Sequence, residues 1–168
     1  MKYLKALIGM ILLIGFDQWT KYMVLLNVKP VRRIPLIDGV LSFTYHENRG
    51  AVWGIMQGQI PILIIATIII FALIVLIYRK IPDEKRYIWL KITAILIASG
   101  AIGNLIDRVF RKYVVDFIYF ELINFPIFNV ADMYVVIAAI LLFILVLFVY
   151  KDDHDFDFLQ RKSGREDD

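Results

Sequence analysis

The chain has 168 residues, a length typical of one domain, and 60% of them are hydrophobic while only 21% are charged. Soluble domains average roughly 45–50% apolar residues, so this composition excludes an ordinary water-soluble domain and predicts a membrane protein. The net charge of +3 is too small to indicate nucleic-acid binding, and the absence of cysteine excludes thiol catalysis, zinc–cysteine sites and disulfide bonds.

Four stretches are apolar over the roughly 20 residues that a helix needs to cross a membrane. They cover about residues 4–26, 60–78, 88–106 and 133–150. Lys2 and Lys5 precede an apolar run that ends near Phe16, as in a cleavable signal peptide, but no small-x-small cleavage site follows, so we interpret residues 4–26 as a retained span. We therefore expect a membrane all-α bundle of four transmembrane helices as one domain over residues 1–150, followed by a polar, mobile cytoplasmic tail over 151–168.

Basic residues predict the orientation of the bundle. The short connection between the second and third stretches carries Arg79, Lys80, Lys85 and Arg86. Short loops rich in Lys and Arg stay in the cytoplasm, so this loop and both termini are expected there. The segments 27–59 and 107–132 would then be extracytoplasmic.

Both extracytoplasmic segments are too long to be simple connectors and show strand-like patterns. Residues 41–46 alternate apolar and polar side chains after the turn signal Asp38-Gly39. Residues 113–120 form a β-like run around one carboxylate, Asp116. These patterns predict a small β-containing subdomain on the membrane surface.

Polar side chains inside the spans are costly, so each is a candidate functional residue. They occur late in the first span, at the end of the third and at the start of the fourth, and in an alternating bundle these places lie at the same membrane face. The sequence therefore predicts one polar site near one interface. The residues are Asp17, Lys21, Asn104, Asp107, Arg108, Asn129 and Asp132, with Asn48-Arg49-Gly50 in the first extracytoplasmic segment.

Structural explanations stand beside the functional ones. Asp17 and Lys21, four residues apart, favour an ion pair on one helix face. Asn129 and Asp132 have the spacing of a helix N-cap and its third position. His46 has no companion for a metal site.

Among hydrolytic mechanisms, paired carboxylates have the most support. Ser99 could act as a nucleophile with Lys21 or His46 as its base. However, Ser99 lies in a run of small residues that favours helix packing. No HExxH motif is present. Asp116 and Asp132 are the best pair to share a proton around a water molecule.

Two other classes of protein remain open. A small transporter or channel subunit would use the intramembrane charges as an ion path, and a structural partner in a membrane complex would not need the carboxylates. An ion path predicts polar residues along the whole membrane depth, whereas residues 62–77 and 135–149 contain no charge.

Five sequence blocks, in this order, resemble the lipoprotein signal peptidase family, also called signal peptidase II and classed as aspartyl peptidase family A8. The resemblance extends from about Gly9 to Val149 and includes the length and the four spans. The blocks are Phe16-Asp17-Gln18-Trp19-Thr20-Lys21-Tyr22, Asn48-Arg49-Gly50-Ala51-Val52-Trp53-Gly54, Gly100 to Arg108, Val114-Val115-Asp116-Phe117-Ile118 and Phe128-Asn129-Val130-Ala131-Asp132.

This resemblance implies an aspartyl endopeptidase of the bacterial cytoplasmic membrane, with its active site near the extracytoplasmic face. Such an enzyme cuts the signal peptide from diacylglyceryl-modified prolipoproteins, just before the lipidated cysteine. Its partners would be this substrate and membrane lipids, and we expect a monomer without metal, cofactor or nucleic acid. The implied catalytic pair is Asp116 and Asp132, and the implied substrate-binding or supporting residues are Asn104, Arg108, Asn129, Asn48, Arg49, Gly50, Asp17, Lys21 and Trp53, the last on a loop that closes over the site.

The roles of the two aspartates can be predicted from their neighbours. Asp132 lies in the first turn of the fourth span, where the helix dipole favours a charged carboxylate. Asp116 lies between Val115 and Phe117, where apolar surroundings favour the neutral form. We therefore expect Asp132 to be the base and Asp116 to carry the proton.

Overall fold

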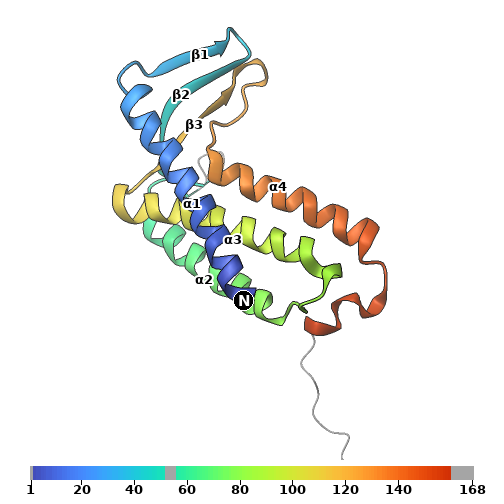
Figure 1. Cartoon of the computed structure of the whole chain (residues 1–168). Helices are drawn as coiled ribbons and strands as arrows, with labels where there is room; N and C mark the ends of the chain where they lie inside the picture. Colours follow the sequence, from blue (N-terminus) through green and yellow to red (C-terminus); the bar gives the residue numbers. More distant parts are fainter. Residues whose placement is uncertain (1, 52–55, 160–168) are drawn as a thin grey trace, which may run out of the picture.

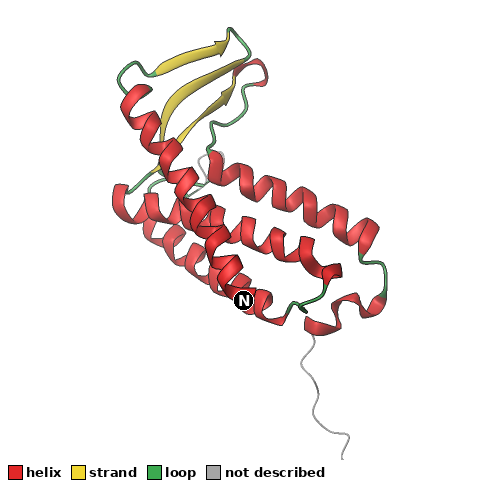
Figure 2. Ribbon diagram, viewed as in Figure 1, coloured by secondary structure: helices red, strands yellow, loops and turns green. Residues whose placement is uncertain are grey.

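The computed structural model describes residues 2–51 and 56–159. In this part of the chain four long helices form a bundle, and a three-stranded sheet projects beyond the end of the bundle that lies away from the N-terminus (Figures 1 and 2). The helices are α1 (Lys2–Asn27), α2 (Ile60–Lys80), α3 (Ile88–Arg111) and α4 (Val130–Ile144). The predicted arrangement, mostly helical with a small β-containing part, is confirmed.

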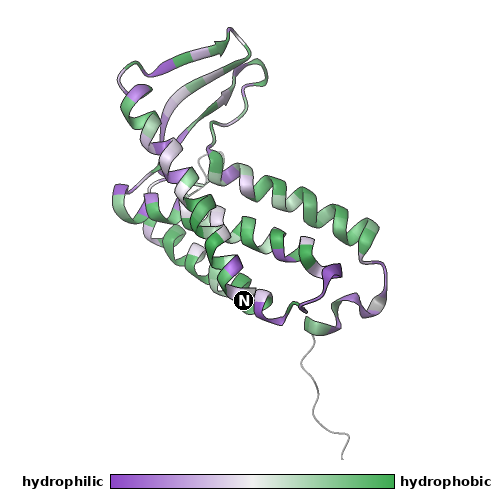
Figure 3. Cartoon of the chain, viewed as in Figure 1, coloured by the Kyte–Doolittle hydropathy of each residue, from purple (hydrophilic) through white to green (hydrophobic). Residues whose placement is uncertain are grey.

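Three helical segments among the described residues are long and apolar enough to cross a membrane: Ile60–Lys80, Lys85–Arg111 and Val130–Val149. Figure 3 shows the apolar character of these helices, most evenly along α4. α1 has 26 residues, but Asp17, Gln18 and Lys21 lower its hydropathy. The chain is thus a multi-pass membrane protein, and a fourth span remains a prediction.

Local chemistry sets the ends of the helices. A proline lies in the first turn of α2, where a missing N–H costs nothing. α3 continues past the predicted residue 106 to Arg111 and stops at Lys112, whose φ of 66° is left-handed. α4 begins at Val130, earlier than the predicted residue 133, because Asn129 caps it, and a π-helical turn over Leu145–Val149 extends it.

The sheet has the antiparallel order β1-β2-β3, with strands β1 (Arg33–Ile37), β2 (Leu41–Asn48) and β3 (Val114–Phe120). β2 and β3 contain the two runs predicted from the sequence, whereas β1 has no alternating pattern and was not predicted. Gly39, with a φ of 69°, allows the turn between β1 and β2. The pairing of β2 with β3 places His46 opposite Asp116.

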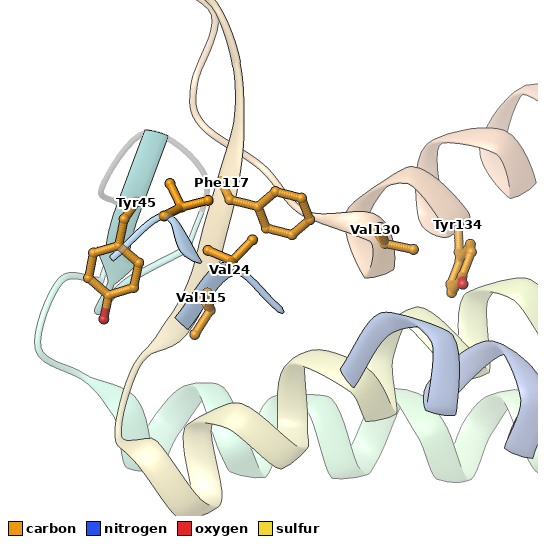
Figure 4. Packing of buried hydrophobic residues seen from close by; sticks show 7 residues of the cluster. Val24, Tyr45, Val115, Phe117, Val130 and Tyr134 are labelled. Carbon is orange, nitrogen blue, oxygen red and sulfur yellow. The ribbon is translucent and has the colours of Figure 1, made fainter. Parts of the chain in front are cut away.

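A hydrophobic cluster attaches the sheet to the bundle (Figure 4). It joins Val24 of α1 and Tyr45 of β2 to Val115 and Phe117 of β3 and to Tyr134 of α4. Val115 and Phe117 are 0% and 4% exposed, so the start of β3 is held between α1 and α4. Asp116 lies between these two anchored residues.

The prediction of a mobile tail is wrong for residues 151–159, and the rest of that predicted tail lies outside the described residues. A 3₁₀ helix over Asp153–Leu159 folds back onto the far end of the bundle. Phe156 and Phe158 pack against a buried cluster that contains Tyr150, and Asp155 accepts two 2.8 Å hydrogen bonds from Arg86. The aromatic side chains within this polar segment explain why it is ordered here.

Candidate active site

A cavity of about 1160 Å³ lies where the sheet meets the bundle. β2, β3, α3 and α4 line it, together with residues 49–51 and 124–128. Its wall along α4 is apolar and includes Val135, Val136 and Ile137. The sequence-predicted residues that line it are Asn48, Arg49, Gly50, Asn104, Arg108, Asp116 and Asp132.

Asp116 is 1% exposed and is held by two amide side chains. Asn48 donates to its Oδ2 at 2.8 Å, and Asn129 donates to its Oδ1 at 2.6 Å. Burial, followed by the negative charge of Asp132, raises the pKa of Asp116 to about 7, against the two amide hydrogen bonds, which act to lower it. This carboxyl group can therefore take up or release a proton near neutral pH.

Asp132 belongs to the first turn of α4 and forms a capping box with Asn129. Its Oδ2 accepts from the backbone N–H of Asn129 at 3.1 Å, and its Oδ1 accepts from Nδ2 of Asn104 at 2.8 Å. The capping interpretation of this spacing is thus correct, but it does not exclude a role in chemistry, because the same carboxylate lines the cavity.

Asn129 connects the two aspartates and is 0% exposed. Its Oδ1 accepts from the backbone N–H of Asp132 at 3.1 Å, while its Nδ2 donates both to Asp116 and, at 3.2 Å, to Oδ1 of Asn104. Each polar atom of this side chain therefore has a partner, which fixes its orientation.

A buried ion network lies behind the cavity and fixes Asn104. Lys21 is 0% exposed, and its Nζ contacts Oδ2 of Asp17 at 2.9 Å, Oδ2 of Asp107 at 3.1 Å and Oδ1 of Asn104 at 2.9 Å. An ammonium group only donates, so it requires the oxygen of Asn104 to face it and the NH₂ group to face Asp132.

Asp17 joins α1 to the beginning of α4, and glycines on α3 make the approach possible. Its Oδ1 accepts from the backbone N–H of Ala131 at 2.9 Å. A Cβ added to Gly103 would lie 2.6 Å from Oδ2 of Asp17, and one added to Gly100 would lie 2.5 Å from the carbonyl oxygen of Ala131. Any larger side chain at either position would push these helices apart.

The segment after β2 closes another side of the cavity. Asn48 accepts from the backbone N–H of Gly50 at 2.9 Å, and Nη2 of Arg108 donates to the carbonyl oxygen of Gly50 at 3.4 Å. Nε of Arg108 is buried and has no hydrogen-bond partner within the described residues. Arg49 instead pairs with Glu47 at 2.9 Å and is exposed.

Comparison with known proteins shows the family to which the chain belongs. A model of the family described as signal peptidase (SPase) II matches residues 9–148. The chain belongs to the signal peptidase II family. The lipoprotein signal peptidase of Geobacillus thermodenitrificans (strain NG80-2) is 44% identical over 137 residues, which is 80% of this chain and 84% of that protein. The lipoprotein signal peptidase of Clostridioides difficile (strain 630) is 45% identical over 140 residues, 82% of this chain and 91% of that protein.

Solved structures support the same relationship. A bacterial membrane enzyme determined by the in meso method at 2.3 Å resolution superposes with a TM-score of 0.76 and 32% identity, over 96% of this chain and 94% of that chain. A second bacterial membrane enzyme, at 1.9 Å, gives a TM-score of 0.74 and 36% identity, over 86% of this chain and 93% of that chain. The fold shared with the first of these membrane enzymes therefore covers the bundle and the sheet together.

Two further residues help to organise this site: Asp107, which was a candidate from the sequence, and Gln18, which was not. Asp107 accepts from the backbone N–H of Val115 at 3.1 Å and pairs with Arg111, which ties α3 to β3 beside Asp116. Gln18 donates to the carbonyl oxygen of Gly103 at 3.0 Å. Gln18 lies within a motif block, but its contact with Gly103 joins residues 85 positions apart, so no local pattern indicates it.

The other candidates have structural roles or lie outside the described residues. Ser99 is buried, and its Oγ donates to the carbonyl oxygen of Ile95 at 2.7 Å within α3, as expected for a packing residue. His46 is exposed on β2, and no group of three or more metal-binding side chains occurs among the residues that were described. Trp53 lies outside the described residues.

Proposed function

We propose that this chain is an aspartic endopeptidase that removes the signal peptide from diacylglyceryl-modified prolipoproteins by cutting before the lipidated cysteine. One observation carries the proposal: two aspartates, Asp116 and Asp132, reach the same cavity from different elements and share Asn129 as a hydrogen-bond partner. The names of the relatives, lipoprotein signal peptidases, indicate the substrate class.

In the proposed resting state Asp132 is the base and Asp116 carries the proton. The α4 N-terminus, a backbone N–H and the amide of Asn104 all favour a negative charge on Asp132. Asp116 has apolar residues on both sides of it in β3, and burial raises its pKa to about 7. The groups that favour a charge on Asp132 therefore support its assignment as the base, with Asp116 as the acid.

The proposed reaction is peptide hydrolysis by water without a covalent intermediate. The water oxygen forms a bond to the scissile carbonyl carbon while Asp132 takes a proton from that water. Asp116 donates its proton to the carbonyl oxygen. When the tetrahedral intermediate collapses, the C–N bond breaks and the proton held by Asp132 passes to the leaving amine. The carbonyl re-forms and returns a proton to Asp116, so the starting state is restored.

The remaining predicted residues would bind substrate or support the pair. Arg108 reaches the cavity with an unpartnered Nε, which suits it to the substrate backbone. Asn48 and Gly50 shape the segment beside Asp116, and Arg49 lies at the rim. Asp17 and Lys21 would act indirectly, by orienting Asn104.

Membrane placement fits this substrate. We infer that α1 is a fourth span, because its 26 residues extend about 39 Å and its outer face is apolar, including Leu4, Ile11 and Leu12. Both termini would be cytoplasmic and the cavity extracytoplasmic, at the depth where a lipid-modified residue lies beside the membrane. The apolar wall along α4 would hold acyl chains.

The test uses the purified protein in detergent with a synthetic prolipoprotein peptide that carries a diacylglyceryl cysteine. Asp116→Asn and Asp132→Asn should each abolish cleavage while the thermal unfolding transition remains, and Ser99→Ala, a matched control on a buried polar side chain, should cleave normally. Normal cleavage by either aspartate variant would refute the pair. If the wild type did not cleave this peptide, a transport or structural role would take precedence.

A further inference from the structure

A second cavity lies at the opposite end of the bundle from the candidate active site. It has a volume of about 510 Å³ and is lined by α1, α2 and α3, within the range of roughly 300–1,000 Å³ that is typical of ligand sites. Ala94 and Ala98 of α3 form its floor, Leu7 of α1 and Val75 of α2 belong to its walls, and Arg79 lies at its rim. We call it the α1–α2 groove.

Small side chains create this groove. Gly9 of α1 lies beside Ile95 of α3, and even an added Cβ there would lie 3.9 Å from Cγ2 of Ile95, an ordinary van der Waals distance. Ala94 and Ala98 do not fill the space between α1 and α2. Apart from Tyr3, Tyr78 and Arg79 the lining is apolar, so an unfilled space would lose dispersion contacts and would offer water few polar partners. In a membrane protein the material available to fill such a space is a lipid acyl chain.

The rim of the groove carries a positive charge that is available for a ligand. Arg79 is exposed in the last turn of α2, and within residues 2–51 and 56–159 it takes part in no ion pair. The carboxylate of Asp83, close along the chain, is paired with Lys91. Guanidinium groups bind phosphate oxygens in a bidentate manner, so the rim suits a phosphate at the boundary of the apolar region.

We propose that the α1–α2 groove binds one phospholipid, with an acyl chain on the alanine floor and the headgroup phosphate on Arg79. The site prefers a lipid of net negative charge, because a zwitterionic headgroup brings a cation close to the guanidinium. It is distinct from the substrate cavity and does not depend on the catalytic mechanism.

Native mass spectrometry of the protein released from mixed nanodiscs tests the site. Equal amounts of phosphatidylglycerol and phosphatidylcholine are supplied, and the lipids retained per protein are counted. The wild type should retain one lipid, mainly phosphatidylglycerol. Arg79→Gln should lower the ratio of anionic to zwitterionic lipid about fivefold, as expected for one basic residue near a membrane surface. Ala94→Leu, which fills the floor, should abolish retention of both lipids.

Two control variants match these changes. Lys85→Gln removes a basic residue at the same end of the bundle, and Ala72→Leu adds the same volume on an exposed face of α2; neither residue lines the groove. Both should retain lipid as the wild type does. Equal losses in test and control variants, or full retention by Ala94→Leu, would overturn the proposal. Cleavage of the lipopeptide, which takes place at the other end of the bundle, reports whether each variant is folded. If Ala94→Leu does not fold, the ratio of anionic to zwitterionic lipid retained by Arg79→Gln still decides the proposal.

Discussion

Asn129 donates a 2.6 Å hydrogen bond from its side-chain amide to Oδ1 of Asp116, and the two residues are 0% and 1% exposed. The same side chain caps α4 by accepting from the backbone N–H of Asp132. One residue therefore sets both the start of a helix and the position of an aspartate on a strand.

These two functions of Asn129 can be separated by substitution. Asn129→Ala should lower stability by about 1 kcal/mol, the usual cost of losing an N-cap, and should lower kcat/KM by roughly a hundredfold because Asp116 loses one of its two amide partners. Asn129→Ser keeps a capping oxygen but cannot reach Asp116. It should therefore recover the melting temperature and not the rate; recovery of both would contradict the link to Asp116.

The pH dependence of stability should report on Asp116. Its pKa is about 7 when folded and near its ordinary value, about 4, when unfolded. Between these pH values the unfolded chain has released the proton and the folded chain still holds it. The free energy of unfolding therefore falls progressively as pH rises from about 4 to 7, and this contribution to stability is fully lost above pH 7. The melting temperature of the wild type minus that of Asp116→Asn should therefore be smaller at pH 8 than at pH 5. A difference between the two proteins that does not change with pH would contradict the raised pKa.

The reaction rate should also follow this group. Because the proposed mechanism requires a protonated Asp116, single-turnover cleavage should decrease as pH rises through about 7. The measurement uses one lipopeptide at constant ionic strength, and a rate that keeps increasing up to pH 9 would exclude Asp116 as the acid.

The close approach of α1, α3 and α4 predicts opposite effects for two Gly→Ala substitutions. Gly103→Ala should destabilise the protein by about 1–3 kcal/mol, because its Cβ would lie 2.6 Å from Oδ2 of Asp17. Gly15→Ala in α1 meets nothing within 4 Å and should be neutral or stabilise the helix by about 0.5–1 kcal/mol. Thermal unfolding in one detergent distinguishes them, and equal shifts would indicate that α3 has room to move.

Removing the buried ammonium of Lys21 should be costly. Lys21→Met leaves Asp17 and Asp107 without their shared cation and should destabilise the protein by about 3–5 kcal/mol. The double variant Lys21→Met/Asp17→Asn also removes the negative charge of Asp17, whereas Asp107 keeps its pair with Arg111, and it should recover part of this loss. Lys29→Met, at an exposed pair with Glu47, should change stability by less than about 1 kcal/mol.

The C-terminal 3₁₀ helix should stabilise the bundle without affecting catalysis. A chain that ends at Tyr150 loses Phe156, Phe158 and the partner of Arg86, and should lose on the order of 2–3 kcal/mol of stability. A chain that ends at Leu159 keeps these contacts and should regain the stability that they supply. The rate of lipopeptide cleavage should be the same in both, since the substrate cavity lies at the other end of the bundle.

Patterns along the chain determined the elements that depend on local periodicity. Apolar runs of span length predicted the long helices, and alternation predicted β2 and β3. The placement of Asp17, Asn104 and Asp132 at one face also followed from the sequence alone, because successive spans alternate in direction. The motif blocks predicted the family, which the match over residues 9–148 confirms.

Tertiary structure decided the features that depend on contacts between distant residues. β1 exists because β2 offers it hydrogen bonds, since its own sequence has no strand pattern. The link from Asn129 to Asp116 and the three contacts of Lys21 follow from the packing of α1, α3 and β3, which no local pattern encodes. Residues 151–159 are ordered because Phe156 and Phe158 pack against an apolar surface of the bundle. Local periodicity thus determines which segments form, whereas complementary packing determines which polar atoms meet.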